Sequence, residues 1–172
     1  MGEHHAPLLA VLFEDSQISS VKMGRIEVDG RDANRVVRSL LRSMRFDAVM
    51  LSGISFGGFN LINIDKLAHD TRKPVIALTG DKPDNKAVRT ALRDHFDDWR
   101  ERWQMVLAAG RVYSCKPLKD EPKLYFEVKG ASPAFAREVV RATAVISRLP
   151  EPIRVASILA RGLSSLIEAR SP

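Results

Sequence analysis

The segment Phe46–Asn60, FDAVMLSGISFGGFN, constrains the fold of this chain more than any other stretch. An uninterrupted apolar run over residues 48–51 passes directly into a loop that holds Gly53, Gly57 and Gly58. A short continuous apolar run is typical of a strand covered on both faces, as in the middle of an α/β sheet. In open α/β sheets, ligands and catalytic groups lie at the carboxyl ends of such strands. The segment therefore predicts a central strand followed by a functional loop.

The rest of the chain predicts an alternation of strands and helices that is typical of one α/β domain with a mixed sheet, which we expect to span residues 1–172. Apolar residues bounded by turn residues predict strands, and apolar residues at helical spacing after capping residues predict helices. The expected strands are Pro7–Phe13, Ile18–Val28, Ala48–Leu51, Pro74–Leu78, Arg111–Lys116 and Lys123–Lys129, the first two and the last two forming hairpins. The expected helices run from an N-cap at Asp32 to about Arg45, over Ile62–Thr71, over Lys86–Phe96 after a cap at Asp84, from Asp97 or Asp98 through Ala109, from a cap at Ser132 to about Ser147, and over Ile153–Glu168.

Charge and composition narrow the classes of partner. A net charge of +6 and a pI of about 9.8 make polyanions the first partners to consider. The single cysteine, Cys115, excludes an intrachain disulfide framework and fits a reducing compartment. No stretch approaches the length of a membrane span, and the apolar segment 6–13 has no secretory charge pattern. We expect a cytoplasmic protein that binds DNA or RNA and no membrane.

Two interpretations compete for the glycine-rich loop. Residues 53–57 match the G-x-S-x-G nucleophile elbow of hydrolases, with Ser55 as the nucleophile. Alternatively, Ser52-Gly53 stands where some nucleases place a metal-binding Asp-Gly pair. A hydrolase triad needs an acid and then a histidine after the serine, but the last histidines are His69 and His95, both on expected helices. We therefore interpret Ser55 as a residue of a tight turn.

Other cofactor motifs do not fit. The glycines are spaced G-x-x-x-G-G rather than G-x-G-x-x-G, so the loop does not predict a dinucleotide site. One cysteine and four dispersed histidines exclude a zinc site.

Two clusters of basic and aromatic residues have two interpretations each. Four arginines occupy about three turns of one helix face, so they either follow a phosphate backbone or form a solvated face. Trp99 and Trp103, with Arg100 and Arg102 beside them, either offer a stacking surface for bases or anchor their helix to the core. The four arginines are Arg35, Arg38, Arg42 and Arg45.

Several segments, taken in order, resemble an archaeal family of unknown function that is related to endonuclease V. The most specific are G-F-N after the glycine turn and R-x-P-E-P-x-R-x-A near the end. The resemblance covers almost the whole chain and implies a ribonuclease H-like fold, with a mixed sheet flanked by helices. The segments are Val28–Ala33 (VDGRDA), Leu51–Asn60 (LSGISFGGFN), Pro74–Ile76 with Lys82–Asp84, and Ser147–Ala156 (SRLPEPIRVA).

The resemblance also implies an activity, because endonuclease V proteins use magnesium to cut nucleic acid near deaminated bases such as inosine. Such chemistry needs several carboxylates that converge on one metal ion. The family's aspartate on the central strand falls on Ser52, and its closing acidic or histidine position falls on Ser157. Asp29 matches a further acidic position, which makes it the candidate metal ligand, and Lys82 matches a lysine near the scissile phosphate. Gly53 would allow close backbone approach, and the expected nucleic-acid contacts on the arginine row are Arg35, Arg38 and Arg42.

The first strand of the family, which carries another aspartate, should lie upstream of Leu8. Three arrangements are open. Pro7–Phe13 takes that place with Glu14 or Asp15 as the acid, or the strand precedes Met1, or two chains complete each other in a homo-oligomer.

We therefore expect an endonuclease V-like nucleic-acid-binding protein with a degenerate metal site and weak or no cleavage. One alternative is an active endonuclease that acts near deaminated bases, with magnesium as its cofactor. The other alternative is a non-catalytic oligomeric scaffold.

Overall fold

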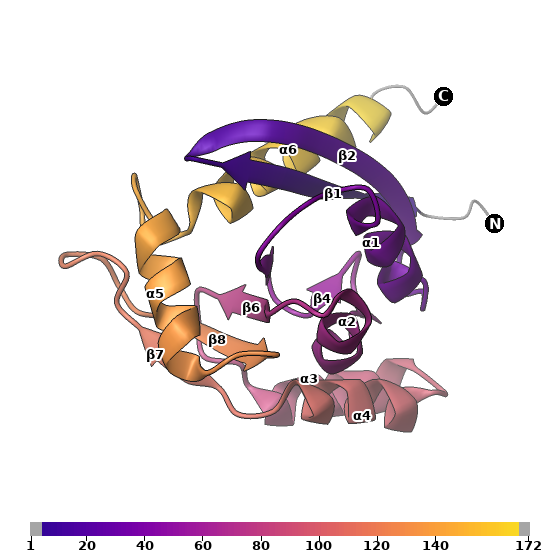
Figure 1. Ribbon diagram of the computed structural model, residues 1–172. Helices are drawn as coiled ribbons and strands as arrows, with labels where there is room; N and C mark the ends of the chain where they lie inside the picture. The colour runs from indigo at the N-terminus through magenta and orange to yellow at the C-terminus, as the bar shows by residue number, and fades with distance from the viewer. Residues whose placement is uncertain (1–4, 169–172) are drawn as a thin grey trace.

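The computed structural model describes residues 5–168, and Figure 1 shows strands in the centre of the molecule with helices around them. No helix in this range is both long and apolar enough to cross a lipid bilayer. The strands are β1 (His5–Glu14), β2 (Gln17–Glu27), β3 (Val49–Leu51), β4 (Ser55–Phe56), β5 (Asn60–Leu61), β6 (Val75–Thr79), β7 (Tyr113–Cys115) and β8 (Leu124–Lys129). The helices are α1 (Ala33–Leu41), α2 (Ile64–Thr71), α3 (Asn85–His95), α4 (Trp99–Ala109), α5 (Pro133–Thr143) and α6 (Glu151–Glu168).

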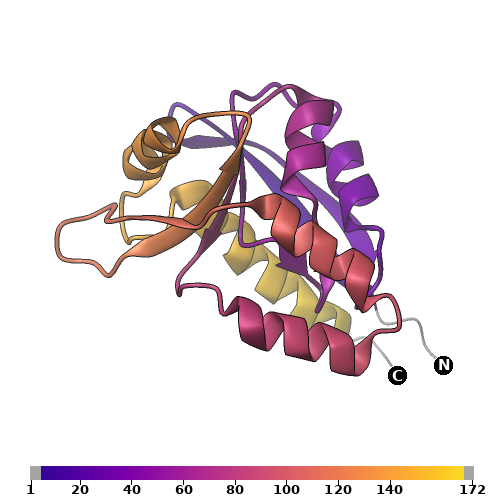
Figure 2. The same cartoon turned by 90° about the horizontal axis from the view of Figure 1, so that it is seen from below.

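The main sheet has four strands in the order β3-β6-β8-β7. β3 and β6 are parallel, β8 is antiparallel to β6, and β7 is antiparallel to β8. A parallel pair next to antiparallel strands is a mixed sheet, and helices flank it on both faces (Figures 1 and 2). The predicted α/β class and both predicted hairpins, β1–β2 and β7–β8, are confirmed.

The sheet lies between two apolar clusters, as the continuous apolar run predicts. Val49 and Leu51 of β3 pack in one cluster, with side chains of α1 and α2. Met50 packs against the other cluster, which contains side chains of α5 and α6. β6 alternates in the same way and is buried over residues 75–78. Because burying one such aliphatic side chain contributes about 1.5–3 kcal/mol, these two strands anchor both layers of helices.

The β1–β2 hairpin stands apart from the main sheet. Within the described range, β1 pairs only with β2, and β3 pairs only with β6, so each has one edge without a strand partner. An open groove of about 1190 Å³ separates these edges, with residues 9–15 on one side and residues 48–51 on the other. Pro7–Phe13 therefore does not pair with β3, and β3, which the sequence predicted to be central, is an edge strand of the main sheet. The groove is also lined by α1 from one face and by α5 and α6 from the other, through Val37, Leu41, Val139 and Ile153.

Helix α1 begins after Asp32 as predicted, but Asp32 does not cap it through its side chain, and the helix ends earlier than predicted. The carboxylate of Asp32 does not cap the helix and instead accepts a hydrogen bond from the side-chain amide of Asn60, at 2.7 Å. The helix ends at Leu41 rather than near Arg45, because the N–H of Met44 closes a tighter turn on the carbonyl of Leu41. A tertiary contact has overridden the local capping signal.

The last two helices also have other bounds than predicted. α5 ends at Thr143 rather than near Ser147, because the chain leaves helical geometry at the next residue. α6 begins at Glu151 rather than Ile153, and Pro152 sits in the first turn, where a backbone N–H has no helical partner to lose. The short pair β4–β5 was not predicted, since two-residue strands carry no readable periodicity.

Two predicted helix starts are confirmed at atomic detail. The carboxylate of Asp84 accepts the N–H groups of Lys86 and Ala87, both at 3.0 Å, at the start of α3. The hydroxyl of Ser132 accepts the N–H of Phe135 at 3.2 Å at the start of α5. Side-chain acceptors of this kind satisfy backbone donors that the helix leaves free.

Glu127 supplies a test of the buried sheet. It lies on β8 opposite Ala77, is only 7% exposed, and burial raises the pKa of its carboxyl. An acid whose pKa is higher in the folded than in the unfolded state stabilises the fold fully below its unfolded pKa. That contribution is lost as the pH rises through the folded pKa.

We therefore expect Glu127→Gln, which keeps the shape and removes the charge, to raise the free energy of unfolding near pH 8 by about 1–3 kcal/mol. The variant should also lose less stability than the wild type between pH 4 and pH 8. Denaturant unfolding across this range measures both effects. Glu138→Gln, at an exposed position of α5, is the control. A Glu127→Gln protein that is less stable than the wild type at pH 8 would contradict the prediction.

Candidate nucleic-acid site

The carboxyl ends of β3 and β6 meet at one edge of the sheet, because the two strands are parallel neighbours. Ser52 follows β3 and is exposed, and Gly53 packs beside Thr79 at the end of β6. Gly53 has φ +79°, a conformation that favours glycine. Lys82 lies in the exposed loop after β6 and makes no ion pair with any described residue. The structure thus places Ser52, Gly53 and the Lys82 loop at the same edge.

The glycine-rich loop bridges the main sheet and the hairpin. It starts beside β6 at Gly53, and at Gly57 it lies against Ala6 and Ile26 of the hairpin. The hydroxyl of Ser55 donates a hydrogen bond to the carbonyl of Gly58 within this loop. This bond agrees with the interpretation of Ser55 as a turn residue.

Asp29 ties the end of β2 to this loop. It has φ +58°, its N–H donates to the carbonyl of Gly57 at 2.7 Å, and its Oδ1 accepts the N–H of Phe59 at 2.7 Å. A Cβ atom at position 58 would lie 2.1 Å from the same oxygen, so only glycine fits there. The candidate metal ligand therefore already uses one carboxylate oxygen to hold the backbone.

A buried arginine, which the sequence marks only as a neighbour of the two tryptophans, completes this arrangement. Arg102 of α4 donates to the carbonyl of Asp29 at 2.8 Å, of Gly30 at 3.0 Å and of Phe59 at 2.7 Å. Its Nε donates to the carboxylate of Asp98 at 2.8 Å. No sequence signal marks this role, because the chain segments that Arg102 contacts are more than forty residues away.

The charge of Asp98 is stabilised by its surroundings. Burial opposes ionisation, but the hydrogen bond from Arg102 and the charges of Arg102 and Arg31 outweigh it and lower the pKa of Asp98. The resulting ion pair keeps the guanidinium of Arg102 oriented toward the three carbonyls.

Asn60, the last residue of the G-F-N motif, is fully buried and structural. Its Oδ1 accepts the N–H of Ala33 at 3.0 Å, and its side-chain amide donates to the carbonyl of Glu27 at 2.9 Å and to Asp32. It replaces the cap that Asp32 was predicted to supply. The motif therefore holds the start of α1 against the loop after β3.

The arginines of the predicted row differ in their ion-pair partners. Arg35 pairs with Asp32 at 3.3 Å, and Arg38 pairs with Asp70 at 3.2 Å. Arg42 makes no ion pair with a described residue, but it follows the end of α1 and so lies toward the amino end of β3. The structure does not bring these three side chains together at the edge that holds the glycine loop.

The R-x-P-E-P-x-R run also forms structural contacts. Arg148 donates to the carbonyl of Gly80 at 3.2 Å and of Lys123 at 2.9 Å, which joins the loop after β6 to the start of β8. Arg154 donates to Glu151 at 2.6 Å, and this hydrogen bond lowers the pKa of the Glu151 carboxyl. The run thus positions the edge of the sheet rather than presenting free charges.

The described residues do not fit a magnesium site. Ser157 is half-buried on α6, Ser52 is exposed after β3, and Asp29 is hydrogen-bonded to the backbone. Among residues 5–168, no three His, Cys, Asp or Glu side chains lie close enough together to hold a metal ion. Neutral hydroxyls are weak substitutes for the carboxylate oxygens that magnesium prefers.

The fold resembles solved structures. A protein of unknown function from Archaeoglobus fulgidus matches with a TM-score of 0.78 and 24% identity, covering 92% of this chain and 97% of that one. Endonuclease V from Bacillus subtilis matches with a TM-score of 0.58 and 11% identity, covering 97% and 82%. Endonuclease V from Ciona intestinalis, in complex with inosine-containing DNA, matches with a TM-score of 0.55 and 10% identity, covering 95% and 85%. The predicted endonuclease V-like fold is confirmed.

Relatives found by sequence are more similar to this chain than these solved structures are. A UPF0215 protein of Thermococcus gammatolerans is 40% identical over 140 residues, which cover 78% of this chain and 69% of the relative. A UPF0215 protein of Methanopyrus kandleri is 38% identical over 167 residues, covering 94% and 84%. Residues 2–164 match the family described as endonuclease dU. The chain therefore belongs to the endonuclease dU family, an archaeal family related to endonuclease V.

Proposed function

We propose that this protein binds nucleic acid in the manner of endonuclease V and has a degenerate metal site with weak or no cleavage. The fold and the net charge of +6 support binding to a polyanion. The Ciona endonuclease V of the same fold was solved with inosine-containing DNA. DNA or RNA is therefore the proposed partner.

One observation supports the proposed loss of cleavage. At the carboxyl end of β3, where the resemblance places a metal-binding aspartate, the chain has Ser52, and the carboxylate of Asp29 is bonded to the N–H of Phe59. Two or more free carboxylates are what a magnesium-dependent hydrolysis needs at such an edge. No hydrolytic step is assigned to these residues.

The alternative of an active magnesium-dependent endonuclease is favoured by the family match itself, because the family is described as endonuclease dU. The groove between β1 and β3 adds to it, since two free strand edges face a space with helices on both faces. We propose that this groove is the place of the family's first strand. A strand there that carries an acid would add the missing carboxylate.

Cleavage is tested with oligonucleotides that contain inosine or deoxyuridine, in magnesium or manganese. We expect binding without metal-dependent products, both for the present chain and for Ser52→Asp, since one added carboxylate leaves the site incomplete. A version extended by the codons upstream of Met1 is assayed beside it. Products that vanish in Asp29→Asn would replace this proposal with the active endonuclease.

Asp29 is tested as a structural residue by comparing two substitutions. Asp29→Ala removes the acceptor for the N–H of Phe59 and places alanine at φ +58°, so we expect a loss of about 1–3 kcal/mol in the free energy of unfolding. An asparagine side chain at this position keeps an amide oxygen and tolerates the backbone conformation, so Asp29→Asn should lose less than half as much. Urea unfolding measures both. Equal losses would show that the charge, rather than the acceptor, is what the fold needs.

Binding is tested against salt concentration. Phosphate contacts require the affinity for a single-stranded oligonucleotide to fall with salt, by a slope of about 0.7 for each phosphate neutralised. Lys82→Ala should reduce this slope by about that amount, whereas Lys119→Ala, in the exposed loop before β8, should leave it unchanged. Absence of binding at low salt would leave the oligomeric scaffold as the better hypothesis.

A further inference from the structure

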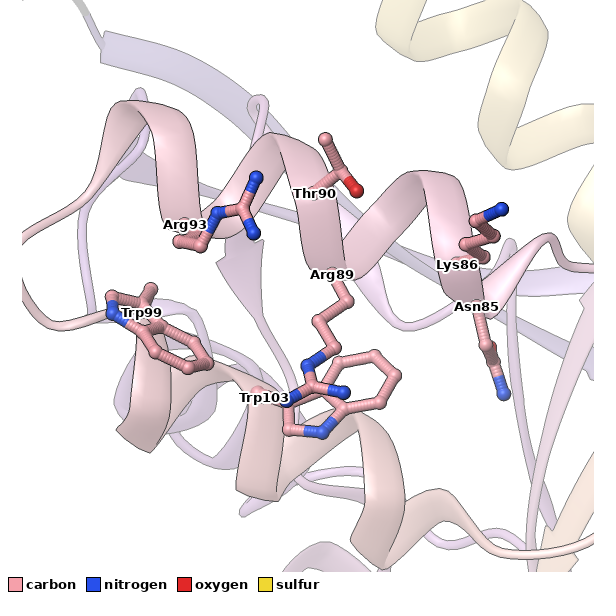
Figure 3. A pocket seen from close by; sticks show the side chains of 7 residues that line it. All are labelled: Asn85, Lys86, Arg89, Thr90, Arg93, Trp99 and Trp103. Carbon is pink, nitrogen blue, oxygen red and sulfur yellow. The ribbon is translucent and has the colours of Figure 1, made fainter.

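The two tryptophans of the chain lie together in a cleft between α3 and α4. Trp99 and Trp103 are one helical turn apart on α4, and the guanidinium of Arg89 on α3 lies 6.0 Å and 5.9 Å from their ring centres. Figure 3 shows Arg89 directed toward Trp103, with the indole of Trp99 to one side. The cleft has a volume of about 440 Å³. Both rings are half-buried, so each keeps an exposed surface.

The charged side chains that line this cleft are all basic. Lys86, Arg89 and Arg93 follow each other at helical spacing on one side of α3 and line it, and no acidic side chain does. Lys86 and Arg89 make no ion pair with a described residue, whereas Arg93 pairs with its neighbour Asp94 at 3.1 Å. Two cations are therefore available to an anionic ligand beside exposed indole rings.

α4 has buried anchors other than the tryptophans. The helix is fixed through Arg102 and Ala109, which are buried and lie on another side of it. Neither indole belongs to the two apolar clusters of the fold. The guanidinium of Arg100 lies 4.6 Å from the ring centre of Trp99 and already contacts that ring. Arg89, 5.9 Å from the ring centre of Trp103, is at the outer limit of a cation–π contact, so Trp103 is the ring on which a flat ligand can stack at little cost.

We propose that this cleft binds single-stranded nucleic acid, with a base stacked on an indole ring and phosphates beside Lys86 and Arg89. Base stacking on aromatic side chains next to a basic groove is how sequence-tolerant single-strand binding works. α3 begins just after the loop that carries Lys82, so the cleft lies on the helix that directly follows this edge of the sheet. The inference rests on the proposed function and adds a second contact surface to it.

The sequence makes the test direct, because Trp99 and Trp103 are its only tryptophans and their fluorescence reports on this cleft alone. Titration with an unlabelled single-stranded oligonucleotide should quench the fluorescence. The midpoint should equal the dissociation constant that the anisotropy of a labelled oligonucleotide gives. Polyglutamate, an anion without bases, should not quench. Binding without quenching would overturn the inference and leave the proposed function standing. Absence of binding would remove both.

Variants separate stacking from charge. Trp103→Leu keeps an apolar side chain and should weaken single-strand binding by about fivefold or more. Arg89→Ala changes an exposed residue and should lower the salt slope by about 0.7, whereas Arg25→Ala, exposed on β2, should not. Circular dichroism melting checks that each variant is folded, and if Trp103→Leu is not, Arg89→Ala decides. An unchanged salt slope in Arg89→Ala would overturn the inference.

Discussion

The hydrogen bonds of Arg102 are the interaction on which the edge of this molecule depends. One guanidinium joins α4 to the turn after β2 and to the loop after β3, through three backbone carbonyls. A buried cation is costly unless all its donors are used, and here Asp98 supplies the opposing charge. Asn60 extends the same network to the start of α1. The glycine loop is therefore held by polar contacts on both sides.

This network also explains how the β1–β2 hairpin stays attached to a sheet with which it shares no strand pairing. The loop over residues 53–60 crosses from β6 to the hairpin, and α1 and α6 pack against β1. The groove between β1 and β3 remains open between these supports. Unpaired strand edges invite a further strand, which is the physical reason to look for one there.

Much of the fold follows from the sequence alone. The apolar run at residues 48–51 predicted a strand buried on both faces, which the structure confirms, although β3 lies at the edge of the main sheet rather than at its centre. Asp84 and Ser132 predicted helix starts that the structure confirms. The prediction that was wrong is the side-chain cap by Asp32, because a residue distant in the sequence takes its place. Asp32 is a good capping residue, but the buried amide of Asn60 takes that role because it is held in place by tertiary packing. Arg102 could not be found, since its partners are set by the fold and not by spacing.

The motifs that carry the family resemblance turn out to be architectural. Asn60 of G-F-N holds the start of α1, and Arg148 of the R-x-P-E-P-x-R run joins the loop after β6 to β8. In the proposed function, cleavage depends instead on a few acidic positions, which the resemblance places at Ser52 and Ser157 of this chain. Family membership therefore argues strongly for the surface that meets nucleic acid and weakly for the chemistry done on it, so the two need separate experiments.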